Sequence, residues 1–120
     1  MNSIERSVSL HPYFKVRAGN LDAAKALHPE FVAKTGGEEK VLYYEFTING
    51  DEVFCREAYA DAGAALAHLA SVGALLDRML ALADLTRLEI HGPAAELARL
   101  KEPLAKLNPA WFAYECGLNR

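Results

Sequence analysis

Two alternating stretches joined by Asn49-Gly50 constrain the fold of this 120-residue chain more than any other feature. Apolar and polar residues alternate from Val41 to Ile48, and the pattern resumes from Glu52 to Ala60. Alternation with period two is typical of strands with one buried face, and Asn-Gly is a preferred two-residue hairpin turn. The sequence therefore predicts a β-hairpin that closes between Ile48 and Asp51.

The position of the turn decides which residues of the hairpin pair and which share a face. The expected pairs are Phe46 with Val53, Tyr44 with Cys55, and Leu42 with Glu57. One face then carries Leu42, Tyr44, Phe46, Val53, Cys55, Glu57 and Tyr59. On the opposite face Glu45 and Arg56 are neighbours, and we expect an ion pair between them.

Further strands and helices flank the hairpin. Alternation predicts a first strand over Ser9–Ala18, in which Pro12 indicates an edge position or an unpaired site because proline lacks a backbone N–H. A helix is expected over Leu21–Thr35, and Pro29 within it predicts a kink near His28 or a helix in two pieces. The other expected elements are a long helix from the N-cap Asp61 to about Leu82, a strand over Leu85–His91, a helix over Ala94–Leu107 and a strand over Ala110–Cys116.

This order of elements predicts an α+β fold of the ferredoxin-like βαββαβ type, with an extra C-terminal helix and strand. The length is that of a single domain, 1–120, in which we expect residues 1–8 to form an N-terminal tail. Helices would cover one face of the sheet and leave Val41, Tyr43 and Phe54 on the other. Since such an apolar face is poorly suited to water, the sequence predicts a symmetric homodimer that packs sheet against sheet.

Composition narrows the class of partner. The net charge is −3 without a cluster of lysine and arginine, which argues against nucleic-acid binding. The residues from Met1 to Val8 carry charges and no apolar run, so we expect neither a signal peptide nor a membrane partner, and a cytoplasmic protein. Cys55 and Cys116 are then reduced thiols. The four histidines lack metal-ligand spacing, and we predict neither a metal nor a cofactor.

The end of the hairpin and the start of the next helix hold the candidate site. Glu57 and Tyr59 end the strand, and His68 lies at the border of the apolar stripe of the helix, where its ring can reach the sheet. A neutral imidazole is suited to accepting a proton near neutral pH. The predicted catalytic residues are His68, Glu57 and Tyr59, and the predicted substrate-binding residues are Tyr44, Cys55 and Phe14.

The same segment carries a family resemblance. The segment resembles a motif of the antibiotic-biosynthesis-monooxygenase family of dimeric α+β barrel proteins, through Glu57-x-Tyr59, the cap Asp61 and the helical His68. The likeness covers the chain from Leu10 to Gly117. The resemblance implies a dimeric α+β barrel with a pocket between sheet and helices. It also implies a cofactor-independent monooxygenase that oxidises a small aromatic or quinol-like substrate with molecular oxygen. His68 would then be the base, Glu57 would hold its tautomer, and Tyr59 would stack on the substrate or hydrogen-bond it.

Other interpretations stay open. His68 also fits the role of a hydrogen-bonded histidine at the rim of the core. Glu57 could instead pair with a backbone amide or an arginine. Tyr59 and Tyr44 could serve only to pack the core. One alternative function is a non-catalytic small-molecule binding or sensing module on the same scaffold. Another is haem binding or degradation with His68 as the iron ligand. Haem-degrading relatives use an asparagine on the first strand, and the stretch Ser9–Ala18 contains none.

Overall fold

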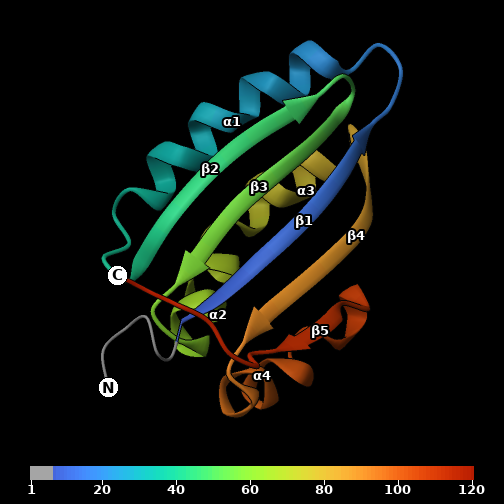
Figure 1. Ribbon diagram of the computed structural model, residues 1–120. Coiled ribbons are helices and arrows are strands. Elements are labelled where there is room, and N and C mark those ends of the chain that lie inside the picture. The colour runs from blue at the N-terminus through green and yellow to red at the C-terminus, as the bar shows by residue number, and fades with distance from the viewer. Residues whose placement is uncertain (1–6) are drawn as a thin grey trace.

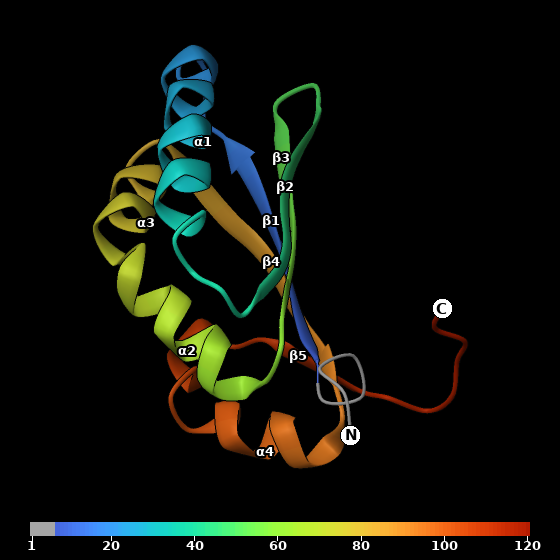
Figure 2. The same cartoon turned by 90° about the vertical axis from the view of Figure 1, so that its left-hand side faces the viewer.

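The computed structural model describes residues 7–120, which form one five-stranded sheet in the order β2-β3-β1-β4-β5 (Figure 1). The elements are β1 (Val8–Val16), α1 (Leu21–Thr35), β2 (Val41–Asn49), β3 (Glu52–Tyr59), α2 (Ala62–Ser71), α3 (Gly73–Leu80), β4 (Ala83–Gly92), α4 (Ala94–Lys101), the 3-10 helix η1 (Ala105–Leu107) and β5 (Ala110–Ala113). The helices lie on one side of the sheet, and the C-terminal segment crosses to the other (Figure 2). The predicted α+β, ferredoxin-like fold is confirmed. Most of the expected N-terminal tail, residues 1–6, lies outside the described residues, and Val8 already belongs to β1.

The central strand is β1, so the predicted edge position for Pro12 is wrong. This strand pairs antiparallel with β3 on one side and with β4 on the other. Pro12 faces Leu88 in the pairing with β4, whereas the pairing with β3 passes from Leu10 directly to Tyr13. A proline without an N–H is therefore accommodated by a gap in one ladder, as the second alternative predicted.

The hairpin forms with a register that differs from the expected one. Asn49 pairs with Glu52, so Gly50 and Asp51 make the turn, and Phe46 faces Cys55. Gly50 has a φ of +62°, which suits the first position of a type II′ turn. Because the pairing shifts by two residues rather than one, the side chains from Tyr43 to Val53 stay on their expected faces. A further register shift between Val41 and Tyr43 pairs Val41 with Tyr59, so the expected place of Val41 on the exposed face is wrong, and its side chain packs against the buried core. The expected ion pair between Arg56 and Glu45 is present at 3.6 Å.

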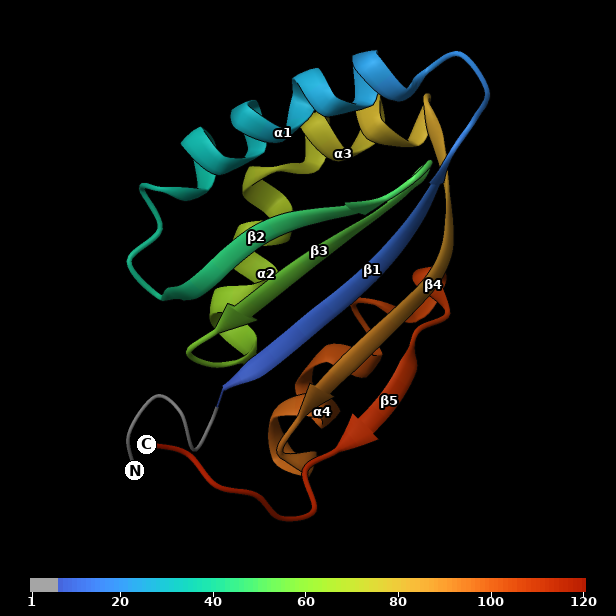
Figure 3. The ribbon, with the colours of Figure 1, turned by 45° about the horizontal axis from the view of Figure 1, so that its top comes forward.

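The predicted long helix after the hairpin is divided in two. The Asp61 side chain caps α2 as expected and accepts a 2.8 Å hydrogen bond from the Ala64 N–H. At Val72 the backbone leaves helical geometry, with φ −95° and ψ 8°, and α3 starts at Gly73 in a new direction (Figure 3). Glycine is a poor helix former, and the turn lets α3 follow the twisted sheet.

Smaller differences occur elsewhere. The helix α1 runs without a break through Pro29. The expected helix over 94–107 divides into α4 and η1, and β5 ends at Ala113 rather than at Cys116. Within residues 7–120, no helix is both long and apolar enough to cross a membrane.

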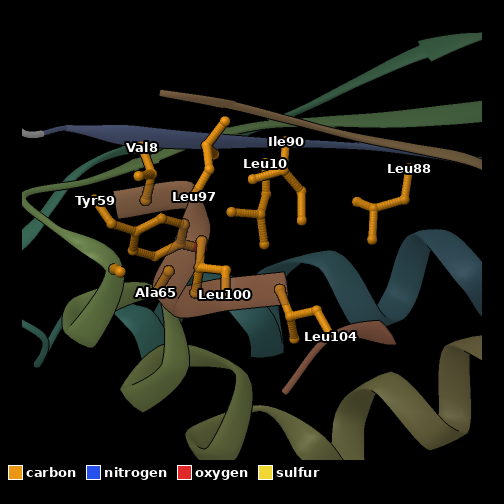
Figure 4. Packing of buried hydrophobic residues seen from close by; sticks show 10 residues of the cluster. Val8, Leu10, Tyr59, Ala65, Leu88, Ile90, Leu97, Leu100 and Leu104 are labelled. Atoms are coloured by element: carbon orange, nitrogen blue, oxygen red, sulfur yellow. The ribbon is translucent and has the colours of Figure 1, made fainter. Parts of the chain in front are cut away.

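Two clusters of buried side chains fill the space between the sheet and the helices. The first joins one end of β1 and β4 to α2 and α4, and Figure 4 shows Tyr59, Ile90 and Leu100 within it. The second joins the other end of the sheet to α1 and α3 and includes Phe31 and Met79. The candidate site lies between these two clusters.

Candidate functional site

An apolar cavity lies between the sheet and the helices α2 and α3. About 60 Å³ of it admits the centre of a water molecule, within about 640 Å³ of space that is free of protein atoms and partly open to solvent. Most of its wall is apolar and includes Leu10, Phe14, Val72, Leu76, Met79 and Leu88. A small apolar molecule is therefore the ligand that this space favours.

Four side chains from three elements make the polar part of the wall. Tyr44 comes from β2, Cys55 and Glu57 come from β3, and His68 comes from α2. Tyr44 and Glu57 are paired across the hairpin, and the ring of Tyr44 lies 4.9 Å from that of His68. Segments up to 24 residues apart in sequence thus place a carboxyl and an imidazole against the same apolar space.

The carboxyl of Glu57 is buried, with 5% of the residue exposed. Burial raises its pKa to about 7, because a charged carboxylate loses its hydration there, while hydrogen bonds from Tyr59 and Cys55 act in the opposite direction. The hydroxyl of Tyr59 donates to Glu57 Oε1 at 2.5 Å. Near neutral pH, Glu57 is therefore present in both its protonated and its ionised form.

The imidazole of His68 lies between two carboxyl groups and is 1% exposed. Its Nδ1 is 3.2 Å from each carboxylate oxygen of Glu38, and its Nε2 is 3.9 Å from Glu57 Oε1. Burial lowers the pKa of His68, and the charge of Glu38 partly opposes this. The interpretation that Glu57 holds the tautomer is wrong for this geometry, because 3.9 Å is too long for a hydrogen bond.

Tyr59 occupies a different place from the one expected. Its side chain is fully buried in the first core cluster and does not line the cavity. It contacts the site from behind, through the hydrogen bond to Glu57 and through its ring, whose centre lies 5.1 Å from that of His68. A direct contact between Tyr59 and a substrate is therefore not supported. The predicted substrate-binding residues Tyr44, Cys55 and Phe14 all line the cavity.

This arrangement can move protons in an apolar environment. A neutral imidazole accepts a proton, and a carboxyl whose pKa is close to 7 donates or accepts one near neutral pH. Burial also raises the pKa of the Cys55 thiol well above its usual range, so this cysteine is a poor nucleophile.

A haem does not fit these residues. Nδ1 of His68 is engaged by Glu38, and Nε2 faces the Glu57 carboxyl at 3.9 Å, which leaves no room for an iron porphyrin between them. Among residues 7–120, no group of three or more His, Cys, Asp or Glu side chains is arranged to hold a metal ion.

Sequence reasoning missed Glu38. It lies 30 residues from His68 in the turn between α1 and β2. Its neighbours Gly37 and Glu39 indicate only a polar turn. Only the packing of this turn against α2 brings the two side chains together.

Comparison with known proteins gives a similar solved structure over almost the whole chain. MupZ from Pseudomonas fluorescens is 39% identical, the match covers 96% of this chain and 95% of MupZ, and the TM-score is 0.92. No known protein-family model matches the chain, and no curated protein matches it.

Two more distant structures share the fold. A conserved protein from Bacteroides thetaiotaomicron, described as a possible oxidoreductase, is 21% identical, with 72% of this chain and 96% of that chain covered and a TM-score of 0.65. A protein named antibiotic biosynthesis monooxygenase is 18% identical, with 69% and 92% covered and a TM-score of 0.61. At these identities the likeness concerns the fold.

Proposed function

Because the chain belongs to the family of MupZ, within the antibiotic-biosynthesis-monooxygenase-like proteins of ferredoxin-like fold, we propose that it is a cofactor-independent monooxygenase. Its substrate is a small aromatic or quinol-like molecule, and His68 is the base. The observation that supports this most is the position of His68 and Glu57 together on the wall of an otherwise apolar cavity.

The cavity wall indicates which molecules enter. None of the lysines and arginines among residues 7–120 lines the cavity, and its one acidic lining residue is Glu57. An anionic substrate would therefore meet no countercharge and would be repelled by the ionised form of Glu57. A neutral ring with one or two hydroxyl groups satisfies both parts of the wall, since its ring packs on the apolar side chains and a hydroxyl reaches His68.

The proposed reaction begins with proton transfer. His68 accepts the proton of the substrate hydroxyl, and the resulting phenolate passes one electron to dissolved dioxygen. The two radicals combine to form a carbon–oxygen bond, and the imidazolium protonates the peroxide. His68 then removes the proton from the oxygenated carbon while the O–O bond breaks, and Glu57 protonates the departing hydroxide. The imidazolium finally passes its proton to the Glu57 carboxylate, which restores both groups. One phenol and one dioxygen thus give one quinone and one water, with the electrons supplied by the substrate.

Oxygen consumption tests this proposal. Purified protein is mixed with 1-naphthol or a hydroquinone, in the presence of a metal chelator, and dioxygen uptake is followed with an electrode. We expect turnover in the wild type and a loss of about 100-fold or more in His68→Gln, because general-base catalysis contributes about that much. The matched control is His28→Gln, which changes a histidine of α1 that does not line the cavity.

Ligand binding separates the enzyme from the alternative binding module. If 1-naphthol quenches the fluorescence of Trp111 with equal affinity in the wild type and in His68→Gln, while neither consumes oxygen, the chain is a binding or sensing module. If neither binds, the proposal of an aromatic substrate is wrong.

We also propose that the chain forms a homodimer through the face of the sheet opposite the helices. This face carries a row of contacting rings from β3, β1, β4 and β5: Phe54, Tyr13, His11, His91 and Phe112. Tyr43 and Phe112 are each 42% exposed there. Light scattering during gel filtration should give twice the mass of one chain, and Phe54→Glu should give the mass of a monomer, because it buries a charge in the interface. A monomeric wild type would contradict the proposal.

A further inference from the structure

The turn that carries Glu38 is held at both ends. The Glu38 N–H donates to the carbonyl of Thr35 at 2.9 Å, at the end of α1, and the Glu38 carbonyl accepts from the N–H of Val41 at 3.2 Å. Two residues later, the carbonyl of Lys40 accepts from the N–H of Ala60 at 2.9 Å, which ties the turn to the end of β3. The backbone therefore fixes the direction from which Glu38 approaches α2.

The side chain of Glu38 meets His68 in a specific way. Nδ1 of His68 is 3.2 Å from Oε1 and also 3.2 Å from Oε2, so one N–H points between the two oxygens. A carboxylate accepts hydrogen bonds and does not donate them, so Nδ1 must be the protonated nitrogen of the neutral ring. Nε2 then keeps its lone pair, on the side of the ring where Glu57 lies.

The two glutamates beside His68 differ in their surroundings. The Glu57 side chain is 6% exposed, whereas the Glu38 side chain is 21% exposed and keeps contact with solvent. A partly hydrated carboxylate retains its charge more readily than a buried one. Glu38 is therefore suited to hold and stabilise an imidazolium, and Glu57 to exchange a proton.

We propose that Glu38 is the positioning residue of this site: its carboxylate holds His68 in the Nδ1–H tautomer, so that Nε2 is the basic nitrogen that faces the cavity. The catalytic consequence rests on the proposed function, since it requires His68 to be the base. The tautomer itself does not, and it is measurable without a substrate.

Nuclear magnetic resonance of protein labelled with ¹⁵N at histidine tests the tautomer. Long-range ¹H–¹⁵N correlation at pH 8 distinguishes a protonated ring nitrogen from a free one by its chemical shift. We expect wild-type His68 to be protonated at Nδ1 alone. Glu38→Ala should lose this preference, whereas Glu38→Gln, which keeps an acceptor oxygen, should retain it. The matched control is Glu39→Ala, which removes the exposed neighbouring charge and should change nothing.

The titration of His68 gives a second readout that packing alone would not move. Because the charge of Glu38 raises the pKa of His68, its midpoint should fall in both Glu38→Ala and Glu38→Gln and stay unchanged in Glu39→Ala. If Glu38→Ala fails to fold, the tautomer of the wild type and the titration midpoint of Glu38→Gln still test the proposal. A wild-type ring protonated at Nε2, or an unchanged midpoint in Glu38→Gln, overturns the proposal.

Activity separates this proposal from the proposed function. If the wild type oxidises a phenol, kcat should fall about tenfold or more in Glu38→Ala with KM nearly unchanged, because the base is misdirected rather than the pocket altered. If His68 shows the expected tautomer but no phenol or quinol is oxidised, Glu38 keeps its positioning role and the monooxygenase proposal fails. If turnover persists unchanged in Glu38→Ala, the catalytic consequence is wrong.

Discussion

Tyr59 and Glu57 lie two residues apart on β3, and the tyrosine hydroxyl donates a 2.5 Å hydrogen bond to the glutamate carboxyl. Tyr59 belongs to the buried core, while Glu57 lines the cavity. This bond therefore links the hydrophobic core to the acid of the site. A change to Tyr59 should therefore alter both the stability of the protein and the proton affinity of Glu57.

Glu57→Gln should remove a pH dependence of stability. The pKa of Glu57 is raised from 4.5 to about 7, so between these values the folded protein keeps a proton that the unfolded chain has lost. The free energy of unfolding then falls as the pH rises through this window, by roughly 3 kcal/mol in total. In urea unfolding, the free energy of unfolding of the variant relative to that of the wild type should increase by about this amount from pH 4 to pH 8.

His68 contributes with the opposite sign in the same window. Its pKa is lowered, so the unfolded chain binds its proton first and the stability it contributes is lost as the pH falls. His68 is present in the wild type and in Glu57→Gln, so their difference reports the titration of Glu57 together with its 3.9 Å contact to His68. A constant difference between the two proteins from pH 4 to pH 8 would show that Glu57 titrates normally.

Tyr59→Phe should raise the pKa of Glu57 further. The lost hydrogen bond stabilises the ionised carboxyl, so its removal favours the protonated form. The ring still fills the core, and we expect a loss of about 1 kcal/mol in the free energy of unfolding. The ¹³C shift of the Glu57 carboxyl, followed against pH, measures the midpoint. Tyr43→Phe, on the exposed face, serves as the control, and an unmoved midpoint in Tyr59→Phe would contradict the argument.

Leu76→Phe should weaken the binding of small aromatic molecules. Leu76 lines the cavity, and a larger side chain there takes space that a ligand needs. Its neighbour Leu75 does not line the cavity, so Leu75→Phe is a matched control for the change in size. We expect the affinity for 1-naphthol to fall about tenfold or more in the first variant alone, measured by fluorescence titration. Equal affinities in the two variants would place the ligand elsewhere.

Gly73→Ala should stabilise the protein. An added Cβ at Gly73 meets no atom within 4 Å, and alanine is the better helix former at the start of α3. We expect a gain of about 0.5–1 kcal/mol in the free energy of unfolding. Gly92→Ala should do the reverse, because its Cβ would lie 2.8 Å from Val8 Cγ1. Denaturant unfolding of both variants checks the pair, and a loss of stability in Gly73→Ala would mean that the break at Val72 needs glycine.

Local patterns were sufficient for the elements and their order. Three of these patterns involve only neighbouring residues: the alternation along β1 and the hairpin, the cap at Asp61 and the apolar stripe of the helix that follows. Each appears in the structure. The register of the hairpin was wrong, because the positive φ of Gly50 suits a turn one residue later than Asn49-Gly50 implies.

Tertiary structure decided the rest. The sequence by itself determined the fold class, the faces of most strand residues and the meeting of Glu57 with His68, because these follow from periods of 2 and 3.6 residues. Val41 is an exception, because the register shift beside it turns its side chain to the core. The sequence did not determine the break at Val72, the central place of β1 or the approach of Glu38. These three features depend on how helices and turns pack on a twisted sheet. This packing brings Glu38 and His68 together across 30 positions, and the residues next to each of them give no sign of the contact.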